Sequence, residues 1–250
     1  MKIVVLGGSG LIGKKTVEIL SSQGHDVIAA SSKSGVNAVT GAGLAEAFKG
    51  ADVVVDVMNS PSWEENAVLE FFKNSTANAL AAEIEAGVKH HVALSVVGTQ
   101  NLQDSAYFRA KKVQEDLITT GKVPYTIVQA TQFYEFLGGI ADYGVDSEGK
   151  VRLSTSHMQP MAAADVSAFT AEVAVAKPLN ATIEVGGPEC ERMCDIVSKY
   201  MKAKHDQREV VASPDAGYFG MPLPDSALVP KDGARRTTTR LEDWLCASVK

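Results

Sequence analysis

Apolar runs with the length of β-strands alternate with amphipathic helical segments along the first half of the chain. The strand-like runs are rich in β-branched residues, and the run over 51–58 is almost continuously apolar, as in a parallel strand covered on both faces. The predicted strands are residues 2–6, 25–30, 51–58, 91–98 and 125–130. The predicted helices are residues 11–20, 41–48, 62–86 and 107–121. This alternation predicts an α/β fold with a Rossmann-type doubly wound parallel sheet.

The segment over 62–86 carries a stripe of apolar side chains at helical spacing, in one helix or in two pieces. We expect this stripe to face the core, and it consists of Val68, Leu69, Phe72, Ala79, Leu80 and Ile84. Gly87 follows the stripe, and glycine commonly ends a helix.

Beyond residue 135 the alternation becomes looser, because glycines interrupt the apolar pattern. We predict short strands at 151–153 and 182–185, and helices that begin near residue 164 and cover 195–203 and 237–245. The proline- and glycine-rich stretch 213–233 is typical of a loop-rich cover. The chain is therefore expected to be one domain over residues 1–250, with a small C-terminal lobe formed by roughly residues 135–250.

A glycine-rich turn joins the first predicted strand to the first predicted helix. Its sequence is Gly7-Gly8-Ser9-Gly10-Leu11-Ile12-Gly13, which satisfies the spacing G-x-G-x-x-G from residue 8 and the overlapping spacing G-x-x-G-x-x-G from residue 7. One glycine allows the sharp bend, another lets backbone N–H groups approach a pyrophosphate, and the last lets the helix pack against the strand. The helix N-terminus favours phosphate. We predict a dinucleotide site at residues 7–13; an ordinary strand-to-helix turn is the alternative.

The residues after the second strand indicate which dinucleotide binds. Enzymes that prefer NAD usually carry an acidic residue here, which accepts hydrogen bonds from the ribose hydroxyls. This chain has Ser31, Ser32 and Lys33 instead, and these side chains suit a 2′-phosphate. NADP is the expected cofactor and NAD is the alternative. Asn59 and Ser60 follow the third strand at the edge where open α/β sheets bind ligands, and we expect them to contact the cofactor unless they only form a turn before Pro61.

Three further residues suit proton transfer. Ser95 lies late in the fourth strand, and Tyr107 and Lys111 are four residues apart at the start of the next helix, on one helical face. A tyrosine phenol has a pKa of about 10, and a neighbouring ammonium favours its ionised form and lowers that pKa. We therefore predict a catalytic set in which Ser95 holds the substrate oxygen, Tyr107 transfers a proton and Lys111 supports both tyrosine and cofactor. A partly buried tyrosine beside a solvated lysine is the alternative.

With these residues the chain resembles the short-chain dehydrogenase/reductase superfamily, and within it the atypical members called NmrA-like or NAD(P)H-binding proteins. The resemblance rests on the glycine turn, on Ser95-Val96-Val97-Gly98, on Tyr107-Phe108-Arg109-Ala110-Lys111, and on Tyr125-Thr126-Ile127-Val128 followed by Ala130-Thr131-Gln132-Phe133. It implies that a nicotinamide cofactor lies on the strand edges and that Ser95 and Tyr107 polarise a carbonyl. It also implies that Lys111 binds the nicotinamide ribose and that residues 130–133 lie beside the carboxamide.

Composition and charge narrow the classes of protein to which the chain can belong. The chain is 45% hydrophobic and 22% charged, with a net charge of −6, which argues against a surface built for nucleic acid. The apolar runs are far shorter than the roughly 20 residues of a transmembrane helix, and no leader pattern precedes the first strand. Cys190, Cys194 and Cys246 lack the partners of a zinc site. We expect a cytoplasmic monomer or homodimer with reduced thiols, no bound metal and no membrane contact.

These observations predict an NADP-dependent oxidoreductase that reduces a small carbonyl or quinone-like molecule, with the C-terminal lobe on the substrate side. Because several atypical relatives bind the cofactor without catalysis, a non-catalytic NADP(H)-binding redox sensor is one alternative. A nucleotide-sugar epimerase or dehydratase is another. The arginines such a diphosphate-binding enzyme would use are scattered here, at Arg152, Arg192, Arg235 and Arg236.

Overall fold

The computed structural model describes residues 1–248, which form two compact units. Unit 1 contains Met1–Gln129 and Val166–Ile183, and unit 2 contains Ala130–Asp165 and the described residues from Glu184 to residue 248. The strands are β1 (Lys2–Leu6), β2 (Asp26–Ala30), β3 (Val53–Asp56), β4 (His90–Val96), β5 (Tyr125–Ala130), β6 (Val151–Ser154), β7 (His157–Met158), β8 (Ala181–Gly186), β9 (Glu191–Arg192), β10 (Val210–Ser213) and β11 (Arg235–Arg236). The α-helices are α1 (Leu11–Ser22), α2 (Leu44–Phe48), α3 (Glu65–Ala86), α4 (Ala106–Thr119), α5 (Leu137–Tyr143), α6 (Ala163–Val175), α7 (Met193–Ala203) and α8 (Leu241–Ser248). Short 3₁₀ turns cover Ser32–Ser34 and Tyr134–Phe136.

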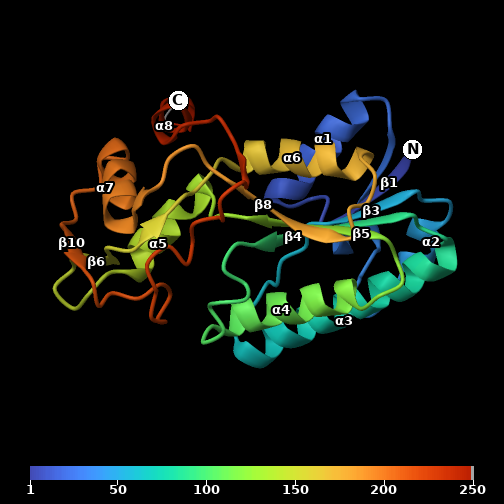
Figure 1. The fold of residues 1–250 in the computed structure, drawn as a ribbon, viewed down its shortest axis with the longest axis horizontal. Helices are drawn as coiled ribbons and strands as arrows, with labels where there is room; N and C mark the ends of the chain where they lie inside the picture. Colours follow the sequence, from blue (N-terminus) through green and yellow to red (C-terminus); the bar gives the residue numbers. More distant parts are fainter. Residues whose placement is uncertain (249–250) are drawn as a thin grey trace. The chain divides into compact units, whose positions relative to one another are not determined.

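A seven-stranded sheet runs in the order β11-β8-β5-β4-β3-β1-β2. Strand β1 pairs in parallel with β2 on one side and with β3 on the other, so the strand order reverses between β1 and β3. In unit 1 the helices α1 and α6 cover one face of the sheet, and α3 and α4 cover the other (Figure 1). This is the predicted doubly wound α/β fold, and the reversal marks the sheet edge where such folds bind ligands.

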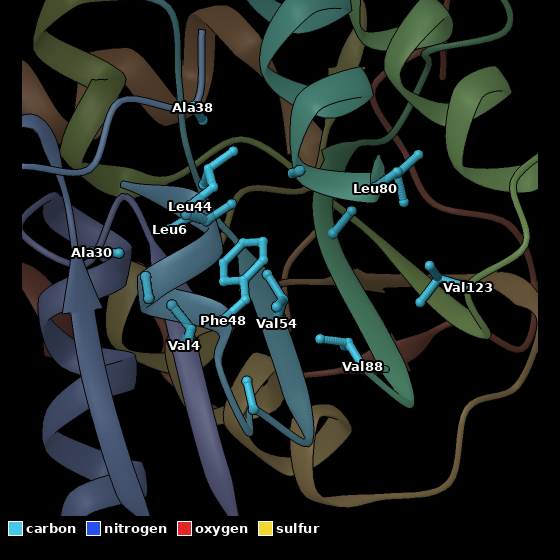
Figure 2. Packing of buried hydrophobic residues seen from close by; sticks show 14 of the residues in the cluster. Val4, Leu6, Ala30, Ala38, Leu44, Phe48, Val54, Leu80, Val88 and Val123 are labelled. Atoms are coloured by element: carbon cyan, nitrogen blue, oxygen red, sulfur yellow. The ribbon is translucent and has the colours of Figure 1, made fainter. Parts of the chain in front are cut away.

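The core of unit 1 lies between the sheet and the helices α2, α3 and α4. Val4 and Val54 from adjacent strands lie close to Phe48 of α2, whose side chain is fully buried (Figure 2). Leu80 of α3 and Val123, just before β5, extend the same cluster. The continuous apolar runs of the parallel strands are thus covered on both faces, as their sequences predict.

Helix α3 is one continuous helix of 22 residues. It begins at Glu65 because the Glu64 carboxylate caps it, accepting hydrogen bonds from the N–H groups of Asn66 and Ala67 at 3.2 and 2.8 Å. It ends at Gly87, which takes the left-handed conformation. Most residues of the predicted apolar stripe do face the core, but the prediction is wrong for Ile84. Its side chain is 51% exposed because the stripe has rotated off the core by the last helical turn.

Unit 2 contains two small sheets. Strands β6 and β10 pair in parallel, and β7 and β9 pair antiparallel. Helix α5 was not predicted, since Gly138 and Gly139 interrupt the apolar pattern there. A Cβ on Gly138 would lie 2.9 Å from the Tyr200 hydroxyl, so the glycine permits the close approach of α7 to α5. None of the helices within residues 1–248 combines the length and apolar character that crossing a membrane requires.

Candidate functional site

The glycine turn bends sharply off β1. The N–H groups of Gly7 and Gly8 both donate to the carbonyl of Ala30 at the end of β2, at 2.9 and 3.2 Å. Gly7 has a φ of +79°, which favours glycine, whereas a Cβ on Gly8 would lie 2.7 Å from Ala29 Cα. The bend therefore depends on Gly7, the first glycine of the overlapping spacing, and Gly8 serves close packing between strands.

The last two glycines of the turn differ in what surrounds them. A Cβ on Gly13 would lie 2.1 Å from the Gly7 carbonyl oxygen, so this glycine lets α1 pack against the end of β1. A Cβ on Gly10 would meet only that same oxygen, at 3.3 Å, and would otherwise point into open space. Gly10 is exposed and is the N-cap of α1.

The turn fits the pyrophosphate of a dinucleotide. The first N–H groups of α1, beginning at Leu11, have no partner within the helix, and the helix dipole places partial positive charge at the same point. Ser9 and Leu11 are exposed beside Gly10, whereas Ile12 is buried. The space that a Cβ at Gly10 would fill is the space that a phosphate needs to reach these N–H groups.

Ser31, Ser32 and Lys33 lie directly after β2 in an exposed turn. The Ser31 N–H donates to Ser34 Oγ at 2.9 Å, and the Ser34 N–H donates back to the Ser31 carbonyl at 2.9 Å. The Ser32 and Lys33 side chains are exposed, and Lys33 forms no ion pair with any of residues 1–248. An ordered turn thus presents the Lys33 ammonium and the Ser32 hydroxyl to solvent at the end of β2, with the half-buried Ser31 beside them.

Asn59 and Ser60 follow β3. The Ser60 hydroxyl is buried and donates to the Ser62 carbonyl at 2.8 Å, and Asn59 Oδ1 accepts the Ser60 N–H at 3.1 Å. These bonds form a turn, and they leave the exposed Asn59 amide nitrogen available to a ligand. The backbone of Val57 and Met58, just before this turn, lies 3.1 Å from the position of a Cβ on Gly7. The end of β3 therefore adjoins the glycine turn.

Ser95 lies in β4, and its side chain contacts α4. Its hydroxyl donates to Glu115 Oε1, which also accepts from Gln129 Nε2 at 2.8 Å, while Glu115 Oε2 accepts from Gln100 Nε2 at 2.9 Å. Glu115 is only 4% exposed. Sequence reasoning missed this carboxylate, although its position four residues after Lys111 puts it on the same helical face.

Lys111 is also buried. Its ammonium donates to the Leu94 carbonyl at 2.9 Å and to Gln114 Oε1, and it lies 4.5 Å from the centre of the Phe72 ring. Gln114 in turn donates to Asp56 Oδ2 at 3.0 Å. Burial lowers the pKa of Lys111 from 10.5 to about 8, against the opposing charges of Asp56 and Glu115.

Tyr107 packs among aromatic rings. Its ring centroid lies 5.3 Å from Trp63, 6.0 Å from Phe72 and 5.8 Å from Phe108. Burial raises the pKa of Tyr107 to about 12. This direction is opposite to the lowering expected from a neighbouring ammonium, because the apolar surroundings disfavour the phenolate. Tyr107 and Lys111 both contact Phe72 and so lie together, whereas the Ser95 hydroxyl is engaged with Glu115.

Residues 130–133 belong to unit 2. The Thr131 N–H donates to the Val185 carbonyl at 3.0 Å and its hydroxyl donates to the Gln159 carbonyl at 2.7 Å, which holds the turn after β5. Ala130 and Gln132 are buried, and Gln132 Oε1 has no hydrogen-bond partner within residues 1–248. Phe133 stacks on Phe136 with ring centroids 5.7 Å apart. The unpaired Gln132 oxygen is the group in this turn that a ligand could satisfy.

The cysteines and the acidic residues do not form a metal centre in the part of the chain that the structure describes. Cys190, Cys194 and Cys246 are free thiols. Residues 1–248 contain no group of three or more histidine, cysteine, aspartate or glutamate side chains that could hold a metal ion.

Comparisons with known proteins identify the family and the fold of this chain. A family model described as NAD(P)H-binding matches residues 7–177, a range that begins at the first glycine of the turn and includes Ser95, Tyr107 and Lys111. A search of curated proteins gives no match.

Several solved structures share the fold. A dTDP-4-dehydrorhamnose reductase from Bacillus anthracis, in complex with NADP, superimposes with a TM-score of 0.73 at 13% identity, covering 100% of this chain and 99% of that one. The Bordetella bronchiseptica enzyme WbmG, in complex with NAD and UDP, gives a TM-score of 0.70 at 15% identity, covering 99% and 93%. A short-chain dehydrogenase/reductase superfamily protein from Agrobacterium tumefaciens with bound NAD gives a TM-score of 0.69 at 18% identity, covering 99% and 96%.

Proposed function

The chain belongs to the NAD(P)H-binding family, and from this premise we propose that it is an NADP-dependent oxidoreductase that reduces a small carbonyl or quinone-like molecule. One observation supports this proposal most strongly. The glycine turn at the β1–β3 reversal leaves open the space that a Cβ at Gly10 would fill, beside the N-terminus of α1. A pyrophosphate suits that space, and Tyr107 and Lys111 provide acid–base groups within the same unit.

A nicotinamide, when bound, would supply the hydride, and the chain would supply binding, orientation and a proton. Gly10 and the first turn of α1 hold the pyrophosphate. Tyr107 is the proton donor, and its raised pKa keeps the phenol protonated at neutral pH, which is the form that reduction of a carbonyl requires. Lys111, fixed by the Leu94 carbonyl and Gln114, places positive charge beside the ring that Tyr107 contacts.

Ser95 is assigned to orient the substrate oxygen, and this role needs a change of partner. Its hydroxyl now donates to Glu115, and it can donate to a substrate only when that bond opens. Glu115 keeps two amide donors, from Gln100 and Gln129, when Ser95 turns away. The carboxylate therefore stays hydrogen-bonded in either state, which limits the free-energy cost of the exchange of partners.

The preference for NADP rests on the turn after β2. Lys33 is exposed and forms no ion pair with the residues the structure describes, and Ser31 and Ser32 stand beside it. An ammonium and two hydroxyls satisfy a 2′-phosphate, whereas a carboxylate at this position would repel it.

The test is single-turnover oxidation of NADPH with a panel of carbonyls, quinones and keto nucleotide sugars, using Tyr107→Phe and, as a matched control, Tyr125→Phe. Tyr125 is a half-buried tyrosine at the start of β5, outside the proposed site. Loss of a general acid should lower the rate of Tyr107→Phe by about 10²–10⁴-fold, with NADPH affinity nearly unchanged. Tyr125→Phe should match the parent. A parental rate for Tyr107→Phe would remove the tyrosine from the mechanism.

A non-catalytic sensor of NADP(H) is the second candidate, and one observation favours it. The Ser95 hydroxyl and the Lys111 ammonium already donate to protein acceptors, so only Tyr107 of the three is uncommitted among residues 1–248. A sensor needs different affinities for NADPH and NADP⁺ and no turnover. Calorimetry with both nucleotides, together with a panel on which no compound is reduced, would establish this function in place of the enzyme.

A further inference from the structure

Unit 2 has a hollow of about 230 Å³ that the proposed reaction does not use. The end of α5, the segment 144–146, strand β6 and the loop 216–220 line it. Three of the lining side chains are aromatic, namely Tyr143, Tyr218 and Phe219, and one is a guanidinium, Arg152. Tyr143 and Phe219 are 58% and 47% exposed, so their rings are accessible at the rim of the hollow.

The loop presents Phe219 in an unfavourable backbone conformation. Tyr218 and Met221 exchange hydrogen bonds at 2.8 and 3.2 Å, which closes a two-residue hairpin turn with Phe219 and Gly220 at its centre. Both central residues have positive φ, +47° for Phe219 and +80° for Gly220. Such turns favour asparagine, aspartate or glycine, and a bulky side chain there is strained. The fold keeps a phenylalanine at a position where a small polar residue would be more stable.

The strained ring belongs to an aromatic cluster. Its centroid lies 5.0 Å from that of Tyr143 and 4.7 Å from that of Tyr218, in tilted and edge-on arrangements. A Cβ on Gly220 would lie 2.7 Å from the Tyr143 hydroxyl, so the glycine lets the turn approach α5 and brings the rings together. Tyr143 and Phe219 each keep about half of their surface exposed, and an exposed aromatic ring is a surface on which a planar ligand can stack.

Arg152 adds a charge to this surface. Among residues 1–248 its guanidinium pairs with Asp146 alone, through Nε at 3.6 Å, which leaves its terminal N–H groups available. The Asp146 carboxylate accepts the N–H groups of Glu148 and Lys150 at 2.9 and 3.0 Å, and these bonds hold its pKa low. The carboxylate is thus satisfied by its own loop, and Arg152 presents charged N–H donors to the hollow.

We propose that this hollow is a binding site for a planar aromatic ligand that carries an anionic group, with the ring stacked on Tyr143 and Phe219 and the anion on Arg152. The strain at Phe219 is retained because the ring is needed for binding. All residues of this site belong to unit 2, and the proposal does not depend on the proposed reductase function.

Calorimetry on the full chain tests the proposal with four probes. Naphthalene-2-sulfonate has the ring and the anion, naphthalene-2-methanol lacks the charge, cyclohexanesulfonate lacks the aromatic ring, and 2-naphthylmethylammonium reverses the charge. Naphthalene-2-sulfonate should bind most tightly. Arg152→Gln should weaken it by about tenfold or more, since a hydrogen bond to a charged group is lost, and should leave the neutral probe nearly unchanged.

The Phe219→Asn variant separates binding from packing. Asparagine tolerates positive φ, so the thermal midpoint should stay level or rise, while affinity for naphthalene-2-sulfonate should fall by about two- to tenfold. Phe136→Ala and Arg236→Gln change an exposed ring and an exposed arginine of unit 2 outside the hollow, and both should bind as the parent does.

Four results would overturn the proposal. The first is a clear fall in the midpoint of Phe219→Asn, which would make the ring a packing element. The second is equal or tighter binding of cyclohexanesulfonate or of the ammonium probe. The third is equal weakening by the control variants. The fourth is no binding of naphthalene-2-sulfonate to the parent.

Discussion

The buried ammonium of Lys111 leads to a prediction about stability. The side chain is 2% exposed, and burial lowers its pKa from 10.5 to about 8. Below pH 8 the lysine is charged in both the folded and the unfolded chain. Between about pH 8 and 10.5 the unfolded chain binds a proton at Lys111 that the folded chain has lost, so the contribution of Lys111 to the free energy of unfolding rises with pH across this window.

The size of the rise follows from the change in pKa. One pH unit corresponds to about 1.4 kcal/mol, so the full window is worth about 3 kcal/mol. Lys111→Met keeps a side chain of similar length and removes the titration. The free energy of unfolding of the parent minus that of Lys111→Met should therefore increase by about 3 kcal/mol from pH 8 to 10.5.

Urea unfolding at pH 7, 8, 9, 10 and 10.5 measures this difference, with Lys112→Met as the matched control. Lys112 is the next residue of α4, and its partly exposed ammonium pairs with Asp116. Because the two curves are subtracted, other groups that titrate at high pH cancel. If the difference between the parent and Lys111→Met stays flat, or matches that of Lys112→Met, the ammonium is not desolvated as described.

The remaining predictions concern the nucleotide site. Gly10→Ala should fold and lose NADPH affinity, because its Cβ enters the space assigned to the pyrophosphate, whereas Gly13→Ala should lower stability by about 1–3 kcal/mol through its clash with the Gly7 carbonyl. Calorimetry measures the NADPH affinity of Gly10→Ala, and urea unfolding measures the stability of Gly13→Ala. Normal NADPH binding by a folded Gly10→Ala would contradict the placement of the pyrophosphate beside Gly10. NADPH should bind more tightly than NADH, and Lys33→Glu should cost NADPH about tenfold or more in affinity with little effect on NADH. Equal dissociation constants for the two nucleotides in the parent chain would refute this preference.

The fold of unit 1 was predictable because its signals are local and periodic. Strands β1 and β5 have the predicted bounds, and the left-handed Gly24 and Gly87 follow the helices they were expected to end. The resemblance to the NAD(P)H-binding proteins, stated on the glycine turn and the Tyr107 to Lys111 segment, is confirmed by the family model. In unit 2 the small strands β7, β9 and β11 have two residues each, too few for any period to appear.

The surroundings of the candidate site were less predictable than its residues. Spacing brings Tyr107 and Lys111 to one face of α4, and both contact Phe72. Spacing cannot reveal that Ser95 donates to Glu115 or that Gln114 joins Lys111 to Asp56, because these contacts depend on how α4 packs on the sheet. The same packing raises the pKa of Tyr107, since burial outweighs the charge that sequence reasoning places beside it.

The division of unit 1 into two stretches of chain determines when it can fold during synthesis. Residues 166–183 belong to the same unit as residues 1–129, and they are joined to it by bonds between distant positions. The Ser167 hydroxyl donates to the Ile12 carbonyl at 3.3 Å, and the Asn180 N–H donates to the Tyr125 carbonyl at 2.7 Å. A nascent chain that has emerged only as far as residue 129 therefore lacks α6, which covers one face of its sheet. The dinucleotide-binding unit can be completed only after residue 183 has left the ribosome, which is before the second stretch of unit 2, beginning at Glu184, has emerged.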